Sequence, residues 1–220
     1  KKKGLIIESS ETVERVAYDD DFSDSNEKVD HTLVLTEEQT AAVREATKDL
    51  QSLAFQTRLI FGVTGSGKTE VYFEAMDEAL KQGGSILFLV PEVSLAPQTV
   101  SRIRNRFEKE KVVVWHSHLS SGERVDAWRS ITKQDSRIVV GARSAIFSPL
   151  PKLRLIIVDE EHEPAYKQED NPRYHARDIA VLRAKFVNAT CLLGSATPSL
   201  ETMHNVNRTK YSLSKLTERV

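Results

Sequence analysis

Gly62-Val63-Thr64-Gly65-Ser66-Gly67-Lys68-Thr69 is the stretch that decides the fold of this 220-residue chain. It matches the phosphate-binding pattern G-x-x-x-x-G-K-[S/T], in which a glycine loop connects a buried strand to a helix. The apolar residues 59–61 precede it and an amphipathic segment follows it, as that context requires. A glycine turn before an ordinary helix is the alternative interpretation, and motifs further along the chain decide between the two.

The chemistry of phosphate binding explains the spacing within this loop. Successive backbone N–H groups can converge on phosphate oxygens only where glycine allows tight turns and close approach. A helix that begins near Lys68 adds its positive dipole end, the Lys68 ammonium group reaches the β- and γ-phosphates, and the Thr69 hydroxyl can bind Mg²⁺. We therefore expect a nucleoside triphosphate with Mg²⁺ to contact Gly62, Thr64, Gly65, Ser66, Gly67, Lys68 and Thr69.

The composition, with 40% hydrophobic and 29% charged residues, is typical of a soluble globular protein. No apolar run could span a bilayer and no signal-peptide pattern is present, so we expect a cytoplasmic location and no membrane partner. The single cysteine, Cys191, excludes an intrachain disulfide and fits a buried small side chain. The chain starts at Lys1 without an initiator Met, which favours a piece of a longer protein.

Charge is distributed unevenly along the chain. The net charge is −1, yet residues 8–30 contain nine acidic and two basic residues. Such an acidic, polar stretch is typical of an exposed linker, so we expect residues 1–30 to precede a domain at 31–220. That domain is mildly basic, which allows localised phosphate contacts without itself predicting DNA binding.

Helical and short apolar segments alternate after residue 35. We expect helices at 36–52, 68–82, 95–109, 120–133 and 176–187, and strands at 57–62, 85–90, 111–115, 137–141, 153–158 and 189–194. This alternation predicts an α/β fold with a doubly wound, mostly parallel sheet and helices on both faces. Ligands of such sheets bind beyond the carboxyl ends of the strands, where the motifs of this chain lie.

A second constellation follows the apolar run 155–158. Asp159 and Glu160 come directly after it, which is the arrangement that delivers one carboxylate to Mg²⁺ and another to the attacking water. Alone the pattern is weak because many strands end in acidic residues, but the upstream phosphate loop strengthens it. His162 could bind a metal, but its acidic neighbours favour a hydrogen-bonding switch. We therefore expect Lys68, Asp159, Glu160 and His162 to be the catalytic residues.

Small hydroxyl residues end the last predicted strand, in the sequence Gly194-Ser195-Ala196-Thr197-Pro198. Ser195 and Thr197 could connect the nucleotide site to a molecule bound across the face of the domain. An isolated Ser/Thr turn is the simpler interpretation.

In this order the motifs resemble those of the first RecA-like lobe of superfamily 2 helicases. The stretch Leu35-Thr36-Glu37-Glu38-Gln39 is similar to the Q motif of that family, which implies that Gln39 reads adenine and that the nucleotide is ATP. Further stretches resemble the bacterial primosomal replication-restart helicases; they are residues 70–72, 90–95, 115–117, 140–147 and 172–178. The resemblance covers about residues 35–207.

The resemblance implies a DNA helicase that hydrolyses ATP to move 3′ to 5′ along single-stranded DNA and that restarts stalled replication forks by primosome assembly. It implies single-stranded and forked DNA, other replication-restart proteins and single-strand binding protein as partners. The second lobe of the family, with its arginine finger, and its zinc-binding cysteines have no counterpart in this sequence. We therefore expect half of an ATPase site, inactive or weakly active alone, that pairs with a second lobe of the same longer chain. Residues 1–30 resemble the tail of the winged-helix region that precedes the lobe in that family.

The resemblance also places expected DNA contacts in loops after the strands. Those that match family positions along the single-strand path are Pro91, Glu92, Ser94, Gly141, Arg143 and Ser144. A later loop interleaves aromatic and basic residues, which favours stacking on bases together with phosphate contacts. Its expected contributors are Tyr166, Arg173, Tyr174 and Arg177. An incidental surface loop is the alternative, and we expect Phe147 and Trp128 to be core residues.

Other interpretations remain open at this stage. The run 101–111 has five basic and two acidic residues, which a solvated helix face explains as well as DNA binding does. A nucleotide-switched binding protein or a small-molecule kinase would share the phosphate loop, but Ser195-Ala196-Thr197 and Gln39 do not belong to kinase chemistry. A double-strand DNA translocase would share all of these motifs.

Overall fold

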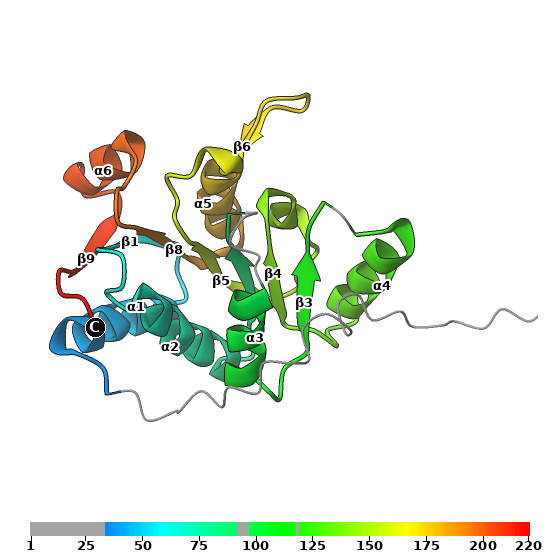
Figure 1. Ribbon diagram of the computed structural model, residues 1–220, viewed down its shortest axis with the longest axis horizontal. Helices are drawn as coiled ribbons and strands as arrows, with labels where there is room; N and C mark the ends of the chain where they lie inside the picture. Colours follow the sequence, from blue (N-terminus) through cyan, green and yellow to red (C-terminus); the bar gives the residue numbers. More distant parts are fainter. Residues whose placement is uncertain (1–33, 92–96, 118) are drawn as a thin grey trace, which may run out of the picture.

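A seven-stranded parallel sheet forms the centre of the protein, in a computed structural model that describes residues 34–91, 97–117 and 119–220 (Figure 1). The strands lie in the order β3-β4-β2-β5-β8-β1-β9, and neighbouring strands are parallel. They are β1 (Gln56–Gly62), β2 (Ser85–Leu89), β3 (Val112–Trp115), β4 (Ile138–Gly141), β5 (Leu153–Val158), β8 (Thr190–Ser195) and β9 (Ser212–Leu216). The predicted doubly wound sheet is thereby confirmed.

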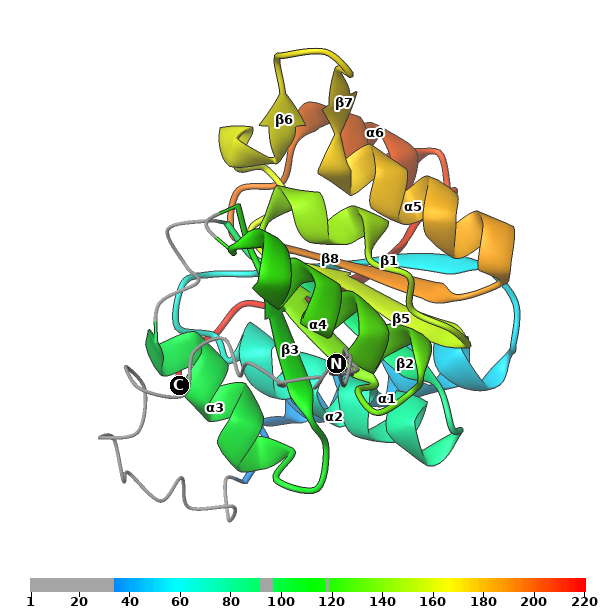
Figure 2. The same ribbon diagram turned by 90° about the vertical axis from the view of Figure 1, so that its right-hand side faces the viewer.

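Helices cover both faces of the sheet (Figure 2). One face carries α1 (Glu37–Gln51), α2 (Lys68–Lys81) and α3 (Pro97–Arg106). The other carries α4 (Ser121–Thr132), the 3₁₀ helix η2 (Arg143–Phe147), α5 (Ala176–Val187) and α6 (Leu200–Asn207). Because both faces are covered, the inner strands are nearly uninterrupted apolar runs, and every residue of β2 is buried.

The elements that the sequence pattern did not reveal are short or lie at the edge. The strand β9 has only two apolar residues, Leu213 and Leu216, and it pairs with β1 alone at the edge of the sheet. A small antiparallel hairpin joins β6 (Lys167–Gln168) to β7 (Tyr174–His175), after the 3₁₀ helix η3 (Pro164–Tyr166). The predicted winged-helix tail at 1–30 lies outside the described residues.

Parallel strands bring three motifs to one edge of the sheet. Phe61 of β1 lies opposite Ser195 of β8, and Val158 of β5 lies opposite Leu193 of β8. Because these strands point the same way, the phosphate loop after β1, the acidic motif after β5 and the Ser-Ala-Thr motif of β8 leave the sheet together.

The β6–β7 hairpin projects from this region beside the first turn of α5 (Figures 1 and 2). It therefore stands next to the edge at which the motifs converge. None of the helices in the described part of the chain is long and apolar enough to cross a membrane.

Candidate active site

Left-handed glycines shape the phosphate loop. Gly65 and Gly67 have φ values of 80° and 76°, which residues with side chains rarely adopt. The loop leads from β1 into α2, whose first residue is Lys68. The Lys68 side chain is only 8% exposed, and its Nζ donates a hydrogen bond to the Gly62 carbonyl at 3.0 Å. The ammonium group is thus held against the loop.

A cavity of about 350 Å³ opens at this loop. Its volume lies within the range of about 300–1,000 Å³ that is usual for small-molecule sites. The structure brings together around it the predicted residues Gln39, Thr64, Gly65, Ser66, Gly67, Lys68, Thr69, Asp159 and Glu160. Gly62 lies behind them as the hydrogen-bond acceptor of Lys68.

The two acidic residues reach the cavity from the end of β5. The Asp159 Oδ1 accepts a hydrogen bond from the Tyr72 hydroxyl at 3.0 Å, and Glu160 Oε1 lies 3.6 Å from Lys68 Nζ. Burial, followed by the neighbouring Glu160 charge, raises the pKa of Asp159. Glu160 has a φ of 44°, which is uncommon outside glycine, and strained backbone of this kind gathers at functional sites.

These residues fit a Mg²⁺ ion that is bound together with phosphate groups. The described residues contain no group of three His, Cys, Asp or Glu side chains able to hold a metal ion. Mg²⁺ is usually held by one or two carboxylates and by substrate phosphates, without a complete cage of protein ligands. The carboxylate of Asp159 and the hydroxyl of Thr69, which line the same cavity, are such a partial ligand set.

His162 connects the acidic motif to the Ser-Ala-Thr motif. Its Nδ1 lies 2.7 Å from Ser195 Oγ and 3.7 Å from Glu160 Oε2. Ser195 Oγ also accepts a hydrogen bond from the Thr197 backbone N–H at 3.0 Å. This geometry favours the hydrogen-bonding switch over metal coordination by His162.

Gln39 has partners that differ from its expected one. Its Nε2 donates to the Ser66 carbonyl at 3.0 Å, and its Oε1 accepts from the Thr36 backbone N–H at 2.9 Å. The second contact completes a capping box at the start of α1. Both ends of the buried amide are therefore engaged within the protein, where Gln39 braces the phosphate loop. The reading of adenine stays an expectation from the resemblance.

A buried ionic network, which the sequence reasoning missed, lies directly behind the catalytic acids. Glu161 is fully buried, and its carboxylate accepts from the Ser199 backbone N–H at 2.7 Å and from Thr202 Oγ1 at 2.9 Å. Arg177 Nη1 donates to the same carboxylate at 3.2 Å and to Ser199 Oγ at 2.6 Å. No spacing rule links positions so far apart in the chain, so the sequence carries no signal for this pair.

The network changes the role of Arg177. The residue is 7% exposed, and its guanidinium also donates to Asp178 at 2.9 Å. We expected Arg177 to contact DNA from a loop, but its N–H groups donate hydrogen bonds to acceptors within the protein. Arg177 instead ties the start of α5 to the acidic motif.

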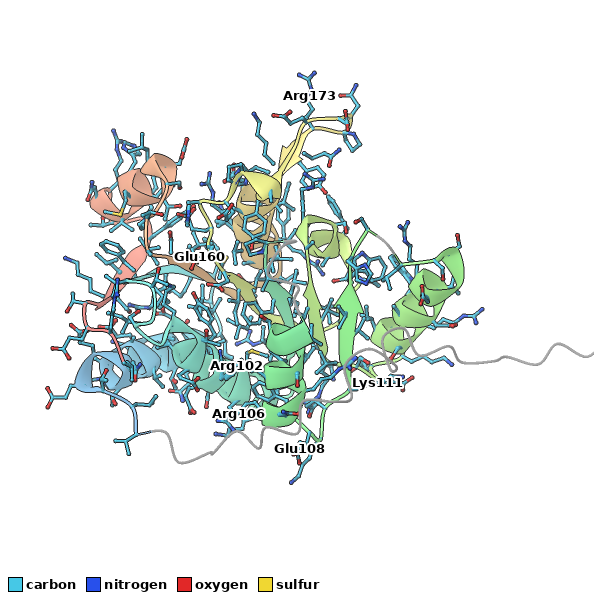
Figure 3. The ribbon with its side chains drawn as sticks, in the orientation of Figure 1. Arg102, Arg106, Glu108, Lys111, Glu160 and Arg173 are labelled. Atoms are coloured by element: carbon cyan, nitrogen blue, oxygen red, sulfur yellow. The ribbon has the colours of Figure 1, made fainter. Side chains whose placement is uncertain are left out.

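A smaller hollow of about 90 Å³ separates the hairpin from the loops after β2 and β4. The predicted DNA residues around it are Pro91, Arg143, Ser144, Tyr166 and Tyr174. Glu92 and Ser94 lie outside the described residues. Gly141 is buried at the end of β4, and Arg173 lies on the hairpin that projects from α5 (Figure 3).

Arg143 fastens the hairpin to the loop after β4. Its Nη1 donates to the carbonyls of Ala165 and Lys167, at 3.3 and 2.6 Å. Both carbonyls lie at the base of the hairpin, so a displacement of the hairpin would be felt at Arg143.

Three aromatic residues differ from their expected positions. Tyr166 is fully buried and its hydroxyl donates to the Asp159 carbonyl at 2.6 Å, so it offers no ring face to a base. Phe147 and Trp128 are 57% and 48% exposed, so the prediction that they are core residues is wrong. In η2 the buried Ala145 and Ile146 fill the core, and the next residue, Phe147, points outward. Its ring lies 5.1 Å from that of Tyr174, nearly edge to face.

Two of the five basic residues in the run 101–111 pair with acidic residues of α2. Arg102 pairs with Glu70 at 2.9 Å, and Arg106 pairs with Glu74 and Asp77 at 3.0 and 2.6 Å. Arg102 and Arg106 also lie far from Arg173 of the hairpin (Figure 3). These contacts favour a solvated helix face over a DNA contact.

Comparison with known proteins agrees with this geometry. The DEAD/DEAH box helicase family matches residues 36–206. The chain is 46% identical over 219 residues to the replication restart protein PriA of Bacillus subtilis (strain 168), covering all of this chain and 27% of the relative. It is 51% identical over 183 residues to PriA of Chlamydia pneumoniae, covering 83% of this chain and 24% of the relative. The chain thus spans about a quarter of the length of these curated relatives.

A solved structure supports the fold independently. The structure of RecG bound to a three-way DNA junction matches with a TM-score of 0.64 at 23% identity, over 86% of this chain and 24% of that one. At this identity the likeness concerns the fold alone. The family match decides against a small-molecule kinase or a nucleotide-switched binding protein of another class.

Proposed function

Since the chain belongs to the DEAD/DEAH box helicase family, in which it matches the first helicase lobe of PriA, we propose that it binds ATP for a replication-restart DNA helicase. The proposed activity of the whole protein is ATP hydrolysis coupled to 3′ to 5′ movement along single-stranded DNA. Its proposed partners are single-stranded and forked DNA, other replication-restart proteins, single-strand binding protein and a second lobe of the same chain.

The convergence of opposite charges at one cavity carries this proposal. Lys68 Nζ, to which we assign phosphate binding, lies 3.6 Å from Glu160 Oε1, to which we assign activation of the attacking water. They lie in the segments that follow two different strands, β1 and β5, whose carboxyl ends lie on the two sides of β8. A phosphate group can therefore be bound and attacked within a single cavity.

The residues of this cavity have separable roles. Loop N–H groups and Lys68 bind and orient the phosphates, while Thr69 and Asp159 hold Mg²⁺. Bound Mg²⁺ supplies positive charge that neutralises the phosphate oxygens. Glu160 orients the attacking water and accepts its proton. His162 contacts both Glu160 and Ser195, so it transmits a change in the position of the Glu160 carboxylate to the Ser-Ala-Thr motif.

Two neighbouring aromatic residues, the exposed Phe147 and the half-buried Tyr174, support the DNA side of the proposal. Phe147 and Tyr174 lie beside the small hollow that Arg143 lines, and Lys167 and Arg173 are exposed on the hairpin. Aromatic rings with nearby basic groups bind single strands without sequence preference, because every base has a face that can stack. We assign base stacking to Phe147 and Tyr174, in place of the buried Tyr166.

Nucleotide binding by this chain tests the proposal. Lys68→Ala should abolish binding of a fluorescent ATP analogue with Mg²⁺, because the charge that neutralises the phosphates is removed. Lys81→Ala is the matched control, since Lys81 lies at the exposed far end of the same helix. A titration should show equal affinity for the wild type and the control. Equal affinity in Lys68→Ala would contradict the phosphate-loop assignment.

A further inference from the structure

Tyr72 connects the phosphate-loop helix to the acidic motif. It lies four residues after Lys68 in α2, so both side chains occupy the same side of the helix. The Tyr72 ring is fully buried, edge-on to Phe88 of β2 at 5.7 Å between centroids. Its hydroxyl donates to Asp159 Oδ1 at 3.0 Å. The one polar atom of this buried ring is thus directed at one carboxylate.

Gly194 makes room for this hydroxyl. A Cβ added at Gly194 would collide with the Tyr72 hydroxyl and lie 3.3 Å from Asp159 Oδ1. The contact therefore depends on the absence of a side chain in β8, directly before Ser195. Three motifs, in α2, β5 and β8, meet at this single oxygen atom.

The backbone of Asp159 is already fixed without Tyr72. Its N–H donates to the Leu89 carbonyl at 2.9 Å, and its carbonyl accepts from the Tyr166 hydroxyl at 2.6 Å. Rotation of the Asp159 side chain is the freedom that remains, and the hydrogen bond from Tyr72 restrains it. Such partners of a ligating carboxylate set its orientation and thereby the affinity for the metal.

We propose that Tyr72 is a positioning residue for Asp159, the Mg²⁺ ligand. The Tyr72 hydroxyl holds Asp159 Oδ1 and leaves Oδ2 for the ion. The inference rests on the proposed function, in which Asp159 binds Mg²⁺. A phenylalanine would fill the same volume in the core, so only the hydroxyl accounts for a tyrosine at this position.

Tyr72→Phe in this chain removes that single hydroxyl. We expect the Mg²⁺ concentration that half-saturates binding of a fluorescent ADP analogue to rise by about 10- to 100-fold, the usual cost of losing such a partner. Binding of the analogue in EDTA and the melting temperature should stay close to the wild type. Tyr211→Phe, which removes a hydroxyl from a tyrosine packed elsewhere against the core, is the matched control and should leave the Mg²⁺ dependence unchanged.

Asp159→Asn separates failure of this inference from failure of the proposed function. If Asp159→Asn raises the Mg²⁺ requirement and Tyr72→Phe does not, the role of Tyr72 is overturned while the metal site stands. If neither variant changes it, Asp159 is not the metal ligand and both assignments fall. Equal losses in Tyr72→Phe with and without Mg²⁺, together with a lower melting temperature, would give the hydroxyl a purely structural role and also overturn the inference.

Discussion

Glu160 combines an unusual backbone conformation with a chemically demanding position. Its positive φ turns the chain so that its carboxylate lies 3.6 Å from Lys68 Nζ while the next residue, Glu161, enters the core. The Glu161 N–H donates to the Gly194 carbonyl at 2.9 Å, which secures this turn. Two consecutive acidic residues thereby have different roles, because Glu160 faces the nucleotide cavity and Glu161 belongs to the buried ionic network.

Glu160→Gln should separate ATP binding from hydrolysis. In the longer protein we expect retained affinity for Mg·ATP and a loss of turnover, because only the group that activates water is neutralised. Binding and single-turnover hydrolysis, measured on the same preparation, check this. Glu163→Gln, a nearby carboxylate outside the cavity, should behave as wild type. Loss of ATP binding in Glu160→Gln would show that its role is assigned wrongly.

At the residue scale the sequence predicts the groups that spacing rules define. Lys68 and Thr69 follow from the phosphate-loop pattern, and Asp159 and Glu160 from an apolar run that ends in acids. Partners formed only by the fold could not be predicted, such as the hydroxyl of Tyr72 beside Asp159. A residue far away in sequence supplies each of these contacts, and no local pattern encodes it.

The β6–β7 hairpin and the start of α5 are the elements that join the two sides of the site. Arg143 holds the base of the hairpin, and Arg177 connects α5 to Glu161 and Ser199. We propose that movement of the hairpin on DNA is transmitted to the acidic motif through α5. The sequence predicts an aromatic and basic loop here, but in the structure some of its residues are exposed and others are buried.

Arg177→Ala should destabilise the protein because it leaves the Glu161 charge buried without its cation. Breaking a buried pair in this way typically costs about 3–5 kcal/mol of the free energy of unfolding. Arg173→Ala, which removes an exposed arginine of the hairpin that precedes α5, is the matched control and should leave stability unchanged. Urea denaturation of this chain measures both. Equal stability of the two variants would contradict a structural role for Arg177.

Phe147→Ala should weaken the affinity of the longer protein for single-stranded DNA. Loss of one base stack costs about 1–3 kcal/mol, and exposure of the ring predicts little change in melting temperature. Phe186→Ala removes a ring on α5 that is 75% exposed, against 57% for Phe147, and should leave binding unchanged. Fluorescence anisotropy with a labelled oligonucleotide distinguishes them. A normal affinity in Phe147→Ala would remove this ring from the DNA path.

Across the whole molecule, the alternation of apolar runs and helical segments predicts the sheet and both helical layers. That signal is strong because inner parallel strands are buried on both faces and read as continuous apolar runs. It fails for β9, which has only two apolar residues, for the eight-residue helix α6, and for the two-residue strands of the hairpin. Apolar content decides which strands the sequence predicts, since β3 lies at the opposite edge of the sheet and is predicted from its apolar run.

The length of the chain corresponds to only part of its curated relatives. The chain spans about a quarter of these relatives. Among the described residues that line its nucleotide cavity the one arginine is Arg102, which pairs with Glu70 at 2.9 Å, so we propose that the arginine finger comes from a second lobe of the longer protein. In phosphate-loop enzymes such an arginine contributes about 10³- to 10⁵-fold in rate. We therefore expect this chain alone to hydrolyse ATP far more slowly than the longer protein.

The rate of ATP hydrolysis by the longer protein, with and without single-stranded DNA, tests the central claim most directly. We expect DNA to raise the rate several-fold, and Lys68→Ala to abolish hydrolysis under both conditions. Stimulation by duplex DNA alone would instead indicate a double-strand translocase. A rate that DNA does not change, or one that this chain matches by itself, would contradict a DNA-coupled ATPase built from two lobes.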